Sequence, residues 1–123
     1  MIAYHLTTLE NYQSIIENGL TPQIGPRSES LGELHPRIYL FPDKLTCIDA
    51  ISNWLGEEFD EEEDLIILQL DITGYSFDSE VGYEITVNEP IPKNRIIKTY
   101  SELEFSESII NETKSTKKNR LKI

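Results

Sequence analysis

The 123-residue chain has one cysteine, one methionine, one tryptophan and two histidines. Its single cysteine, Cys47, excludes an intramolecular disulfide framework and is typical of a reducing compartment. No apolar run approaches the roughly 18 residues that a transmembrane helix needs. The opening MIAYHLTTLEN lacks the basic and apolar segments of a signal peptide. We therefore expect a cytoplasmic protein that does not enter a membrane.

The common signatures of metal and phosphate sites are also missing. The chain contains no glycine-rich phosphate loop, no HExxH pair and no pair of cysteines. Neither His5 nor His35 has cysteine or carboxylate neighbours at a metal-ligand spacing. Cys47 lies among the apolar positions of a predicted helix, where a core role fits better than a nucleophilic one. The sequence therefore predicts no metal site.

Basic residues are scarce outside the last part of the chain. Residues 1–110 hold 21 acidic and 6 basic side chains, a net charge of −15, whereas residues 111–123 hold one acidic and five basic side chains, a net charge of +4. Nucleic-acid affinity depends on neutralising phosphates, so the acidic body favours a protein partner over a nucleic acid. The acidic run 57–64 is expected to be a solvated loop and the basic tail a partly disordered terminus. Either segment can instead dock a partner of opposite charge.

The first part of the chain alternates strand and helix patterns. Residues 2–6 predict a strand, and Thr7 begins a capping-box spacing for a helix over residues 8–18. Gly19 is expected to end this helix in the left-handed conformation. Residues 21–37 contain three prolines and two glycines and predict a long loop, a length typical of functional or disordered segments.

The rest of the chain is richer in strands. We expect a strand over residues 37–41, then a helix capped by Asp43 and ended by Gly56, and a doubly buried strand over residues 65–72. The expected apolar stripe of this helix is Leu45, Ile48, Ile51, Trp54 and Leu55. Shorter strands are expected over residues 75–77, 83–87 and 95–100. Two early helices followed by consecutive strands indicate an α+β fold.

Three residues on separate predicted strands have side chains suited to chemistry. His5 closes the first strand in Y-H-L-T, Tyr39 lies within R-I-Y-L-F, and Glu84 lies within Y-E-I-T-V. A histidine at a strand end and a tyrosine within a strand are ordinary structural residues. A carboxylate between Tyr83 and Ile85 is less ordinary, because it must face solvent, a sheet edge or a cleft.

The order of these motifs resembles the ADP-ribosyltransferase superfamily. H-x-T precedes a helix that ends in N-G-L, followed by I-Y-L-F and by E-I-x-V before P-I-P-x-x-x-I. The set is most similar to the His-Tyr-Glu branch, shared by diphtheria-toxin-like and poly-ADP-ribose-polymerase-like enzymes. The opening and R-I-Y-L-F also resemble small bacterial and phage members, including DarT-type DNA-modifying toxins. The resemblance covers residues 4–97. It implies two small packed β-sheets with a central NAD cleft.

The resemblance also implies an activity, NAD-dependent mono-ADP-ribosylation of a macromolecule, with NAD as the substrate. Glu84 is then the catalytic carboxylate that stabilises the oxocarbenium-like charge formed when the nicotinamide–ribose bond breaks. His5 is expected to bind a ribose hydroxyl and Tyr39 to stack on the nicotinamide ring. The implied NAD-binding residues are His5, Leu6, Thr7, Arg27 and Tyr39.

The chain departs from the family pattern at several positions. Leu6 stands where poly-ADP-ribose polymerases usually carry glycine, so its side chain must point away from NAD. Glu89 and Glu80 compete with Glu84, although Glu89 falls on the opposite face of a regular strand and Glu80 needs a bulge at Gly82. Arg27 is assigned to the pyrophosphate only from its charge and its place in the long loop.

Two other functions remain open for a domain spanning residues 1–110 with a tail over residues 111–123. The first is a catalytically inactive member of this fold whose acidic body binds or inhibits a basic partner. The second is an enzyme similar to the tRNA 2′-phosphotransferases, which also use NAD. That enzyme type needs extra arginines and histidines for the RNA phosphate, whereas the expected domain has only the arginines Arg27, Arg37 and Arg95.

Overall fold

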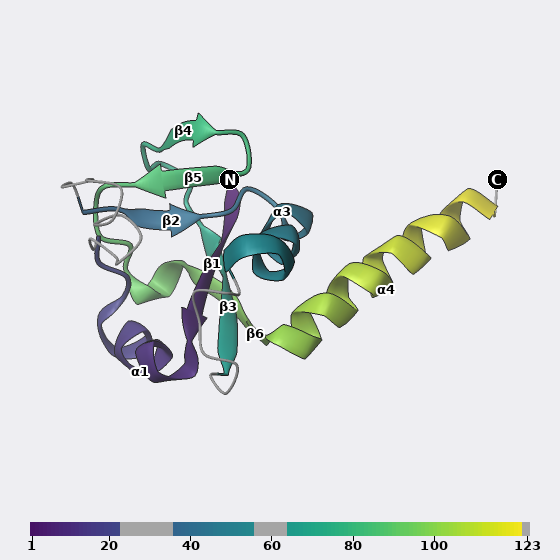
Figure 1. Ribbon diagram of the computed structural model, residues 1–123, viewed down its shortest axis with the longest axis horizontal. Coiled ribbons are helices and arrows are strands. Elements are labelled where there is room, and N and C mark those ends of the chain that lie inside the picture. The colour runs from purple at the N-terminus through teal and green to yellow at the C-terminus, as the bar shows by residue number, and fades with distance from the viewer. Residues whose placement is uncertain (23–35, 56–63, 122–123) are drawn as a thin grey trace.

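Within residues 1–22, 36–55 and 64–121, which the computed structural model describes, the strands form two antiparallel three-stranded sheets (Figure 1). The strands of the first sheet, in spatial order, are β1 (Ile2–Thr8), β3 (Leu65–Asp71) and β6 (Ile96–Ser101). Those of the second are β2 (Ile38–Leu40), β5 (Glu84–Val87) and β4 (Asp78–Val81). The helices of the described chain are α1 (Leu9–Asn18), α3 (Lys44–Ala50) and α4 (Glu102–Leu121). The predicted α+β class with two small sheets is confirmed.

The central strand of the first sheet is the apolar run that the sequence analysis placed over residues 65–72. β3 pairs with β1 on one side and β6 on the other, so Ile67 lies between Leu6 and Tyr100. β1 is longer than the predicted strand over residues 2–6, because Thr7 and Thr8 continue the ladder opposite β3. The expectation that Thr7 caps the following helix is therefore wrong.

The cap of α1 is the next residue, Thr8. Its hydroxyl accepts a hydrogen bond from the backbone N–H of Asn11 at 3.2 Å. Gly19 ends the helix with a φ of +78°, as predicted from the sequence. A Cβ at Gly19 would lie 2.6 Å from the carbonyl oxygen of Ile91, so this close approach also requires glycine.

The two sheets share one apolar core. Ile38 and Leu40 of β2, with Ile85 and Val87 of β5, form a cluster of buried side chains with Ala3, Leu68 and Leu70 of the first sheet. The sheets are also joined through the backbone, because Tyr4 and Phe41 exchange two N–H···O bonds of 2.9 and 2.8 Å. The strand predicted over residues 75–77 is wrong, since β4 begins at Asp78. A 3₁₀ turn, η3 (Lys93–Arg95), precedes β6.

Helix α3 begins as the sequence predicts. Asp43 accepts a hydrogen bond from the backbone N–H of Thr46 at 2.7 Å. The helix continues into a π-helical turn, η1 (Ile51–Leu55), and the predicted stop at Gly56 lies outside the described residues. The predicted apolar stripe is wrong at Leu45, which is 63% exposed. The buried face is formed by Cys47, Ala50 and Ile51, because this side of the helix packs on β1 and on α4.

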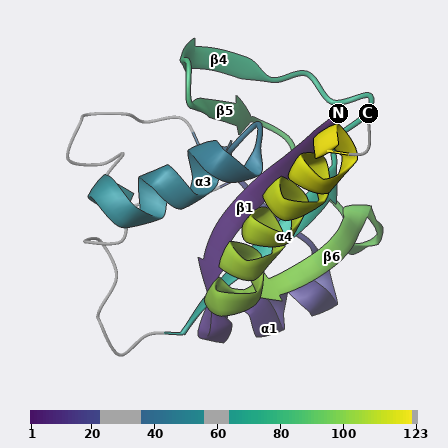
Figure 2. The ribbon, with the colours of Figure 1, turned by 90° about the vertical axis from the view of Figure 1, so that its right-hand side faces the viewer.

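Helix α4 was not expected from the sequence; it runs through the predicted domain boundary at residue 110 and leaves the body at an angle (Figures 1 and 2). Ser101 and Glu104 form a capping box at its start, with reciprocal bonds of 3.2 and 3.1 Å. Phe105, which is fully buried, anchors the first turns by packing on Tyr4 and Tyr100 at ring-centroid distances of 5.7 and 5.4 Å. Residues 111–121 are thus helical in backbone, where the sequence suggested a partly disordered tail.

Candidate functional site

His5 lies in the middle of β1, opposite Leu68, rather than at the strand end that the sequence suggested. Its Nδ1 is 2.9 Å from the carbonyl oxygen of Tyr39 in β2. Because a carbonyl oxygen can only accept, Nδ1 carries the proton of this hydrogen bond. Burial lowers the pKa of His5, although the bond to Tyr39 partly opposes that shift. His5 is therefore a neutral imidazole at pH 7, with Nε2 as an acceptor.

Tyr39 and Glu84 lie on neighbouring strands of the second sheet. Tyr39 pairs with Thr86 in the β2–β5 ladder, and Glu84 precedes Thr86 by two residues. The alternation of side chains along a strand puts all three on one face, opposite the shared apolar core. Glu84 is only 9% exposed and Tyr39 is half-buried. This face therefore carries a shielded carboxylate beside an aromatic ring.

The three strands that carry these residues converge at one point. Continuing the β2–β5 register by one residue places Glu84 opposite Phe41, which bridges Tyr4 of β1. His5 follows Tyr4 and reaches back to Tyr39. These pairings bring the backbones of β1, β2 and β5 close together, whereas the His5 side chain lies on the face of β1 that carries Ala3, and Tyr39 and Glu84 lie on the outer face of the second sheet.

The other predicted NAD-binding residues have different positions. The side chain of Leu6 is buried in the cluster under α3 and α4, on the opposite face of β1 from His5. The Leu6 side chain therefore points away from His5. Thr7 is buried on the same face as His5, two residues along the strand. Arg27 lies outside the described residues.

A cation near this face was missed by the sequence analysis. Arg37 immediately precedes β2, and its spacing from Tyr39 places both on the same face of the strand. The Arg37 side chain is half-buried. The two-residue spacing of Arg37 and Tyr39 in a predicted strand was the signal that both share a face. The sequence prediction assigned the pyrophosphate to Arg27 instead, because Arg27 lies in the long loop.

The two competing carboxylates, Glu89 and Glu80, lie on other parts of the second sheet region. Glu89 lies beyond the end of β5 and is exposed. Glu80 lies within β4, where Val81 pairs with Glu84 across the hairpin. Among Glu84 and Glu89, only Glu84 is shielded from solvent, the condition under which a carboxylate interacts strongly with a developing positive charge.

A separate groove of about 860 Å³ lies on the other side of the first sheet. Its floor comes from Tyr4, Gln69 and Tyr100, and its walls from the start of α3 and the middle of α4. The residues that line it are Ile2, Tyr4, Pro42, Asp43, Lys44, Leu45, Thr46, Asp49, Gln69, Tyr100, Ile109 and Glu112. None of the three predicted catalytic residues is among them.

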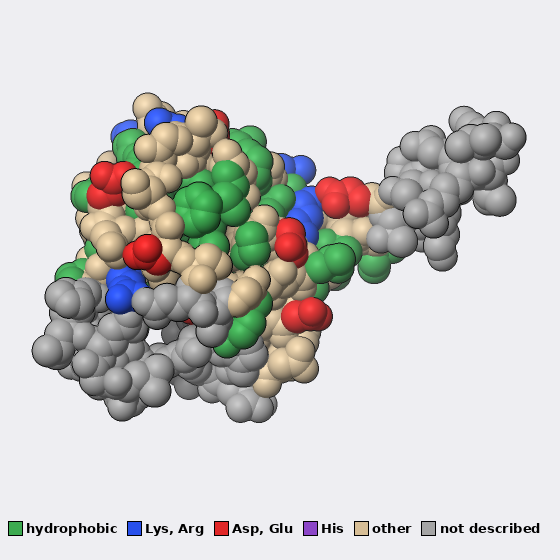
Figure 3. All heavy atoms as spheres, turned by 90° about the horizontal axis from the view of Figure 1, so that it is seen from above, with side chains coloured by type: hydrophobic (Ala, Val, Ile, Leu, Met, Phe, Trp, Pro, Cys, Tyr) green, Lys and Arg blue, Asp and Glu red, His purple; other side chains and the backbone are tan. Residues whose placement is uncertain are grey.

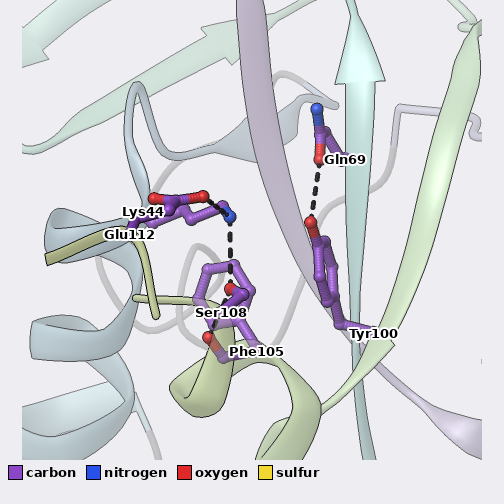
Figure 4. Close-up of polar contacts among 6 residues, drawn as sticks. All are labelled: Lys44, Gln69, Tyr100, Phe105, Ser108 and Glu112. Carbon is purple, nitrogen blue, oxygen red and sulfur yellow. Dashed lines mark hydrogen bonds and ion pairs between the residues drawn. The ribbon is translucent and has the colours of Figure 1, made fainter. Parts of the chain in front are cut away.

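Polar contacts hold the two walls and the floor of this groove in place (Figure 4). The Lys44 ammonium donates to Ser108 at 3.1 Å and pairs with Glu112 at 2.5 Å, which links α3 to α4. The Tyr100 hydroxyl donates to Gln69 Oε1 at 3.2 Å. Burial raises the pKa of Tyr4, so its hydroxyl stays protonated at neutral pH. Sequence spacing contained no signal for this groove, because its residues come from five separate elements.

Two properties of the described chain bear on cofactors and membranes. No group of three or more histidine, cysteine or acidic side chains within residues 1–22, 36–55 and 64–121 is arranged to hold a metal ion. Cys47 is fully buried and burial raises its pKa to about 12, which makes its thiol an inert core group. In the same part of the chain, no helix has both the length and the apolar character needed to cross a bilayer.

Comparison with known proteins shows a likeness in fold. No protein-family model matches the sequence, and no curated protein matches it. A crystal structure of a double mutant of protein CC0527 from Caulobacter crescentus superposes with a TM-score of 0.58, covering 82% of this chain and 85% of that protein. With 10% of residues identical, the likeness concerns the arrangement of helices and strands alone.

Proposed function

We propose that the chain is a NAD-dependent mono-ADP-ribosyltransferase that acts at the junction of its two sheets. The observation that carries the proposal is the carboxylate of Glu84, shielded from solvent on β5, together with a half-buried, neutral His5 that is bonded to the backbone of the neighbouring strand β2. The family resemblance of the sequence supports the same residues. The acidic body favours a protein acceptor over a nucleic acid, and the single buried cysteine favours a cytoplasmic site of action.

His5 has the tautomer that this role needs. Its Nδ1–H is held by the Tyr39 carbonyl, so the ring can accept a hydrogen bond from a ribose hydroxyl at Nε2. The same hydrogen bond fixes the ring orientation relative to β2. His5 therefore acts in binding and orienting NAD, without carrying a charge of its own.

Glu84 supplies the negative charge in the bond-breaking step. The carbon–nitrogen bond between ribose and nicotinamide breaks, and its electron pair leaves with the nicotinamide nitrogen, so the ribose carbon takes on oxocarbenium-like positive charge. A carboxylate that is shielded from water stabilises this charge more strongly than an exposed one. The acceptor nucleophile then bonds to the ribose carbon and releases a proton.

Tyr39 and Arg37 support binding on the same face of β2. The half-buried Tyr39 ring offers an aromatic surface to nicotinamide, and the Arg37 guanidinium suits a phosphate oxygen of NAD. Arg37 takes the role that the sequence analysis gave to Arg27.

The test compares wild type with Glu84→Gln in the presence of NAD, with free nicotinamide measured by chromatography. Glutamine keeps the size of the side chain and removes its charge, so we expect release to fall by about 100- to 1,000-fold, the usual effect of losing one electrostatic stabiliser. Glu89→Gln is the matched control, because this exposed carboxylate lies five residues away. It should release nicotinamide at the wild-type rate.

Stability and binding measurements accompany this assay. Thermal melting of Glu84→Gln should stay near wild type, and calorimetry should show that the variant still binds NAD. Equal release by wild type and Glu84→Gln would contradict the role of the carboxylate. Failure of wild-type protein to bind NAD at all would remove the proposal.

The groove favours a second candidate function, that of an acidic binding module. It is lined by the carboxylates of Asp43, Asp49 and Glu112 together with exposed apolar side chains, and it lies away from the proposed NAD site. In this function the fold is retained without NAD cleavage, and a basic protein segment occupies the groove. Binding of a lysine-rich amphipathic peptide that is weakened by Asp49→Asn, with no NAD binding, would favour this module over the transferase.

A further inference from the structure

Helix α4 is divided into two halves of opposite charge. Residues 102–112 include the acidic side chains Glu102, Glu104, Glu107 and Glu112 and no basic ones. Residues 113–121 include the basic side chains Lys114, Lys117, Lys118 and Arg120 and no acidic ones. A helix with this charge distribution is complementary to a second copy of itself that runs in the opposite direction.

The first half of α4 also exposes large apolar side chains away from the body. Phe105 faces the core, whereas Leu103 and Ile110 are 69% and 53% exposed. Their separation of seven residues corresponds to two helical turns, so both lie on one face. Glu107 lies between them on that face and is exposed. Apolar side chains are visible beside acidic ones at the base of α4 (Figure 3).

The second half of α4 extends from the body rather than along it (Figure 1). Isolated helices shorter than about 12–15 residues are marginal in water, and helices in proteins depend on packing of one face. Phe105 and the pair Lys44–Glu112 anchor the first eleven residues of α4 to the body.

We propose that two copies of the chain associate through antiparallel pairing of their α4 helices. The acidic half of each helix lies along the basic half of the other, and the two-fold axis passes near residues 112 and 113. Leu103 and Ile110 form the apolar part of the seam, and in this register position 107 lies opposite positions 117 and 118, which are lysines in the sequence. Such a contact is isologous and closes as a dimer. The second copy is the favoured occupant because this one chain supplies both charges.

The first experiment measures mass in solution by light scattering over a range of protein concentrations. Wild type should reach twice the 14.2 kDa chain mass, and the dimer should weaken as salt screens the charged halves. Glu107→Lys places a cation against the basic half and should weaken dimerisation by about tenfold or more. Adding Lys117→Glu and Lys118→Glu to the same chain should restore the dimer.

Leu103→Lys and Leu45→Lys provide a matched pair. Both leucines are highly exposed, at 69% and 63%, but Leu45 lies on α3. Leu103→Lys should shift the protein to monomer, and Leu45→Lys should leave the dimer intact. Far-UV circular dichroism and melting curves establish that each variant is folded.

The second experiment tests the direction of pairing by cross-linking with a short bis-maleimide. At 1.5 Å per residue, antiparallel pairing about residues 112 and 113 places two copies of position 110 roughly 7 Å apart along the axis, and two copies of position 103 roughly 28 Å apart. Ile110→Cys should therefore cross-link and Leu103→Cys should not. Wild type is the background control, because its Cys47 is buried.

Each outcome decides the proposal. A dimer that is broken by Glu107→Lys, restored by the triple variant and cross-linked only at position 110 supports it. A monomer at every concentration overturns it, including a monomer whose basic half binds RNA. Cross-linking at both positions would show parallel helices and also overturn it, and a dimer that Leu45→Lys disrupts would place the interface at the groove.

Discussion

Tyr4 and His5 are consecutive residues of β1, and they belong to opposite sides of the first sheet. His5 faces the second sheet, where it bonds the Tyr39 backbone. Tyr4 faces α3 and α4, where it packs on Phe105 and lines the groove. The period of two along a strand thus divides one short segment between two unrelated environments.

The two sides differ in how they are built. The junction side contains a half-buried histidine without charge and a shielded carboxylate, both of which cost free energy to remove from water. The groove side is held by aromatic packing and by polar contacts between helices. Titratable residues that are costly to bury are concentrated at functional sites. The groove contacts are instead explained by the packing of α3 and α4 on the first sheet. We therefore expect changes on the groove side to alter stability, and changes on the junction side to alter NAD cleavage.

Phe105→Ala should have the largest effect on stability. Removing this fully buried ring leaves a cavity beneath α4, and such substitutions typically cost about 3–5 kcal/mol. Urea unfolding measures the loss, and nicotinamide release per folded molecule should not change. Phe105→Leu leaves a smaller cavity, so its free energy of unfolding should lie between those of wild type and Phe105→Ala. A loss of cleavage in folded Phe105→Leu would show that the two sides are coupled.

Tyr39→Ala should produce the opposite pattern. An aromatic stacking contact is worth about 0.5–1.5 kcal/mol, which corresponds to a loss of NAD affinity or cleavage approaching tenfold. Tyr39→Phe keeps the ring and the backbone bond to His5, so it should behave as wild type. The measurement is nicotinamide release at several NAD concentrations. Equal loss in both variants would assign the effect to the hydroxyl rather than to the ring.

Tyr100→Phe tests a single polar contact of the groove. It removes the hydrogen bond to Gln69 while keeping the ring against Phe105, so the free energy of unfolding should fall by about 1 kcal/mol. Urea unfolding provides the value. NAD cleavage should be unchanged, and a fall in cleavage larger than the fall in stability would count against the separation of the two sides.

The pH dependence of stability reports on the junction side. Burial lowers the pKa of folded His5 below the ordinary value of 6.5, so below about pH 6.5 the unfolded chain holds more protons than the folded one. The contribution of His5 to stability is therefore complete above pH 6.5, and it is lost as the pH falls towards its folded pKa. Unfolding free energies from pH 7.5 to 5 should show this loss. His5→Gln should remove it, and His35→Gln serves as the control for the other histidine.

Much of the fold was predictable where local rules decide it. The apolar run of β3, the Asp43 cap and the Gly19 stop each depend on a few neighbouring residues, and each was predicted. The errors occurred where two local patterns competed. Thr7 and Thr8 both suit a cap, and only the pairing of β1 with β3 decided between them. The capping box of Ser101 and Glu104 was present in the sequence and was overlooked.

The sequence predicted which residues form the candidate site, but it did not predict where in the fold they lie. His5, Tyr39 and Glu84 were chosen because their chemistry suits NAD cleavage and their order resembles a family. The approach of the strands that carry them depends on the Tyr4–Phe41 bridge and on the β2–β5 register, which no local pattern indicates. Arg37 was not predicted for the same reason, because its proposed role in phosphate binding depends on its lying on the same face as Tyr39.

The sequence by itself determined the α+β class, the early helices, the central strand and the acidic body, because periodicity, capping and net charge act over short distances or as sums. The tertiary structure alone decided that α3 leaves Leu45 exposed, that His5 is a neutral acceptor, and that a groove lies behind Tyr4. Each of these results depends on contacts between segments far apart in the chain. Such contacts form when the sheets and helices pack together, and the local sequence around each residue does not indicate them.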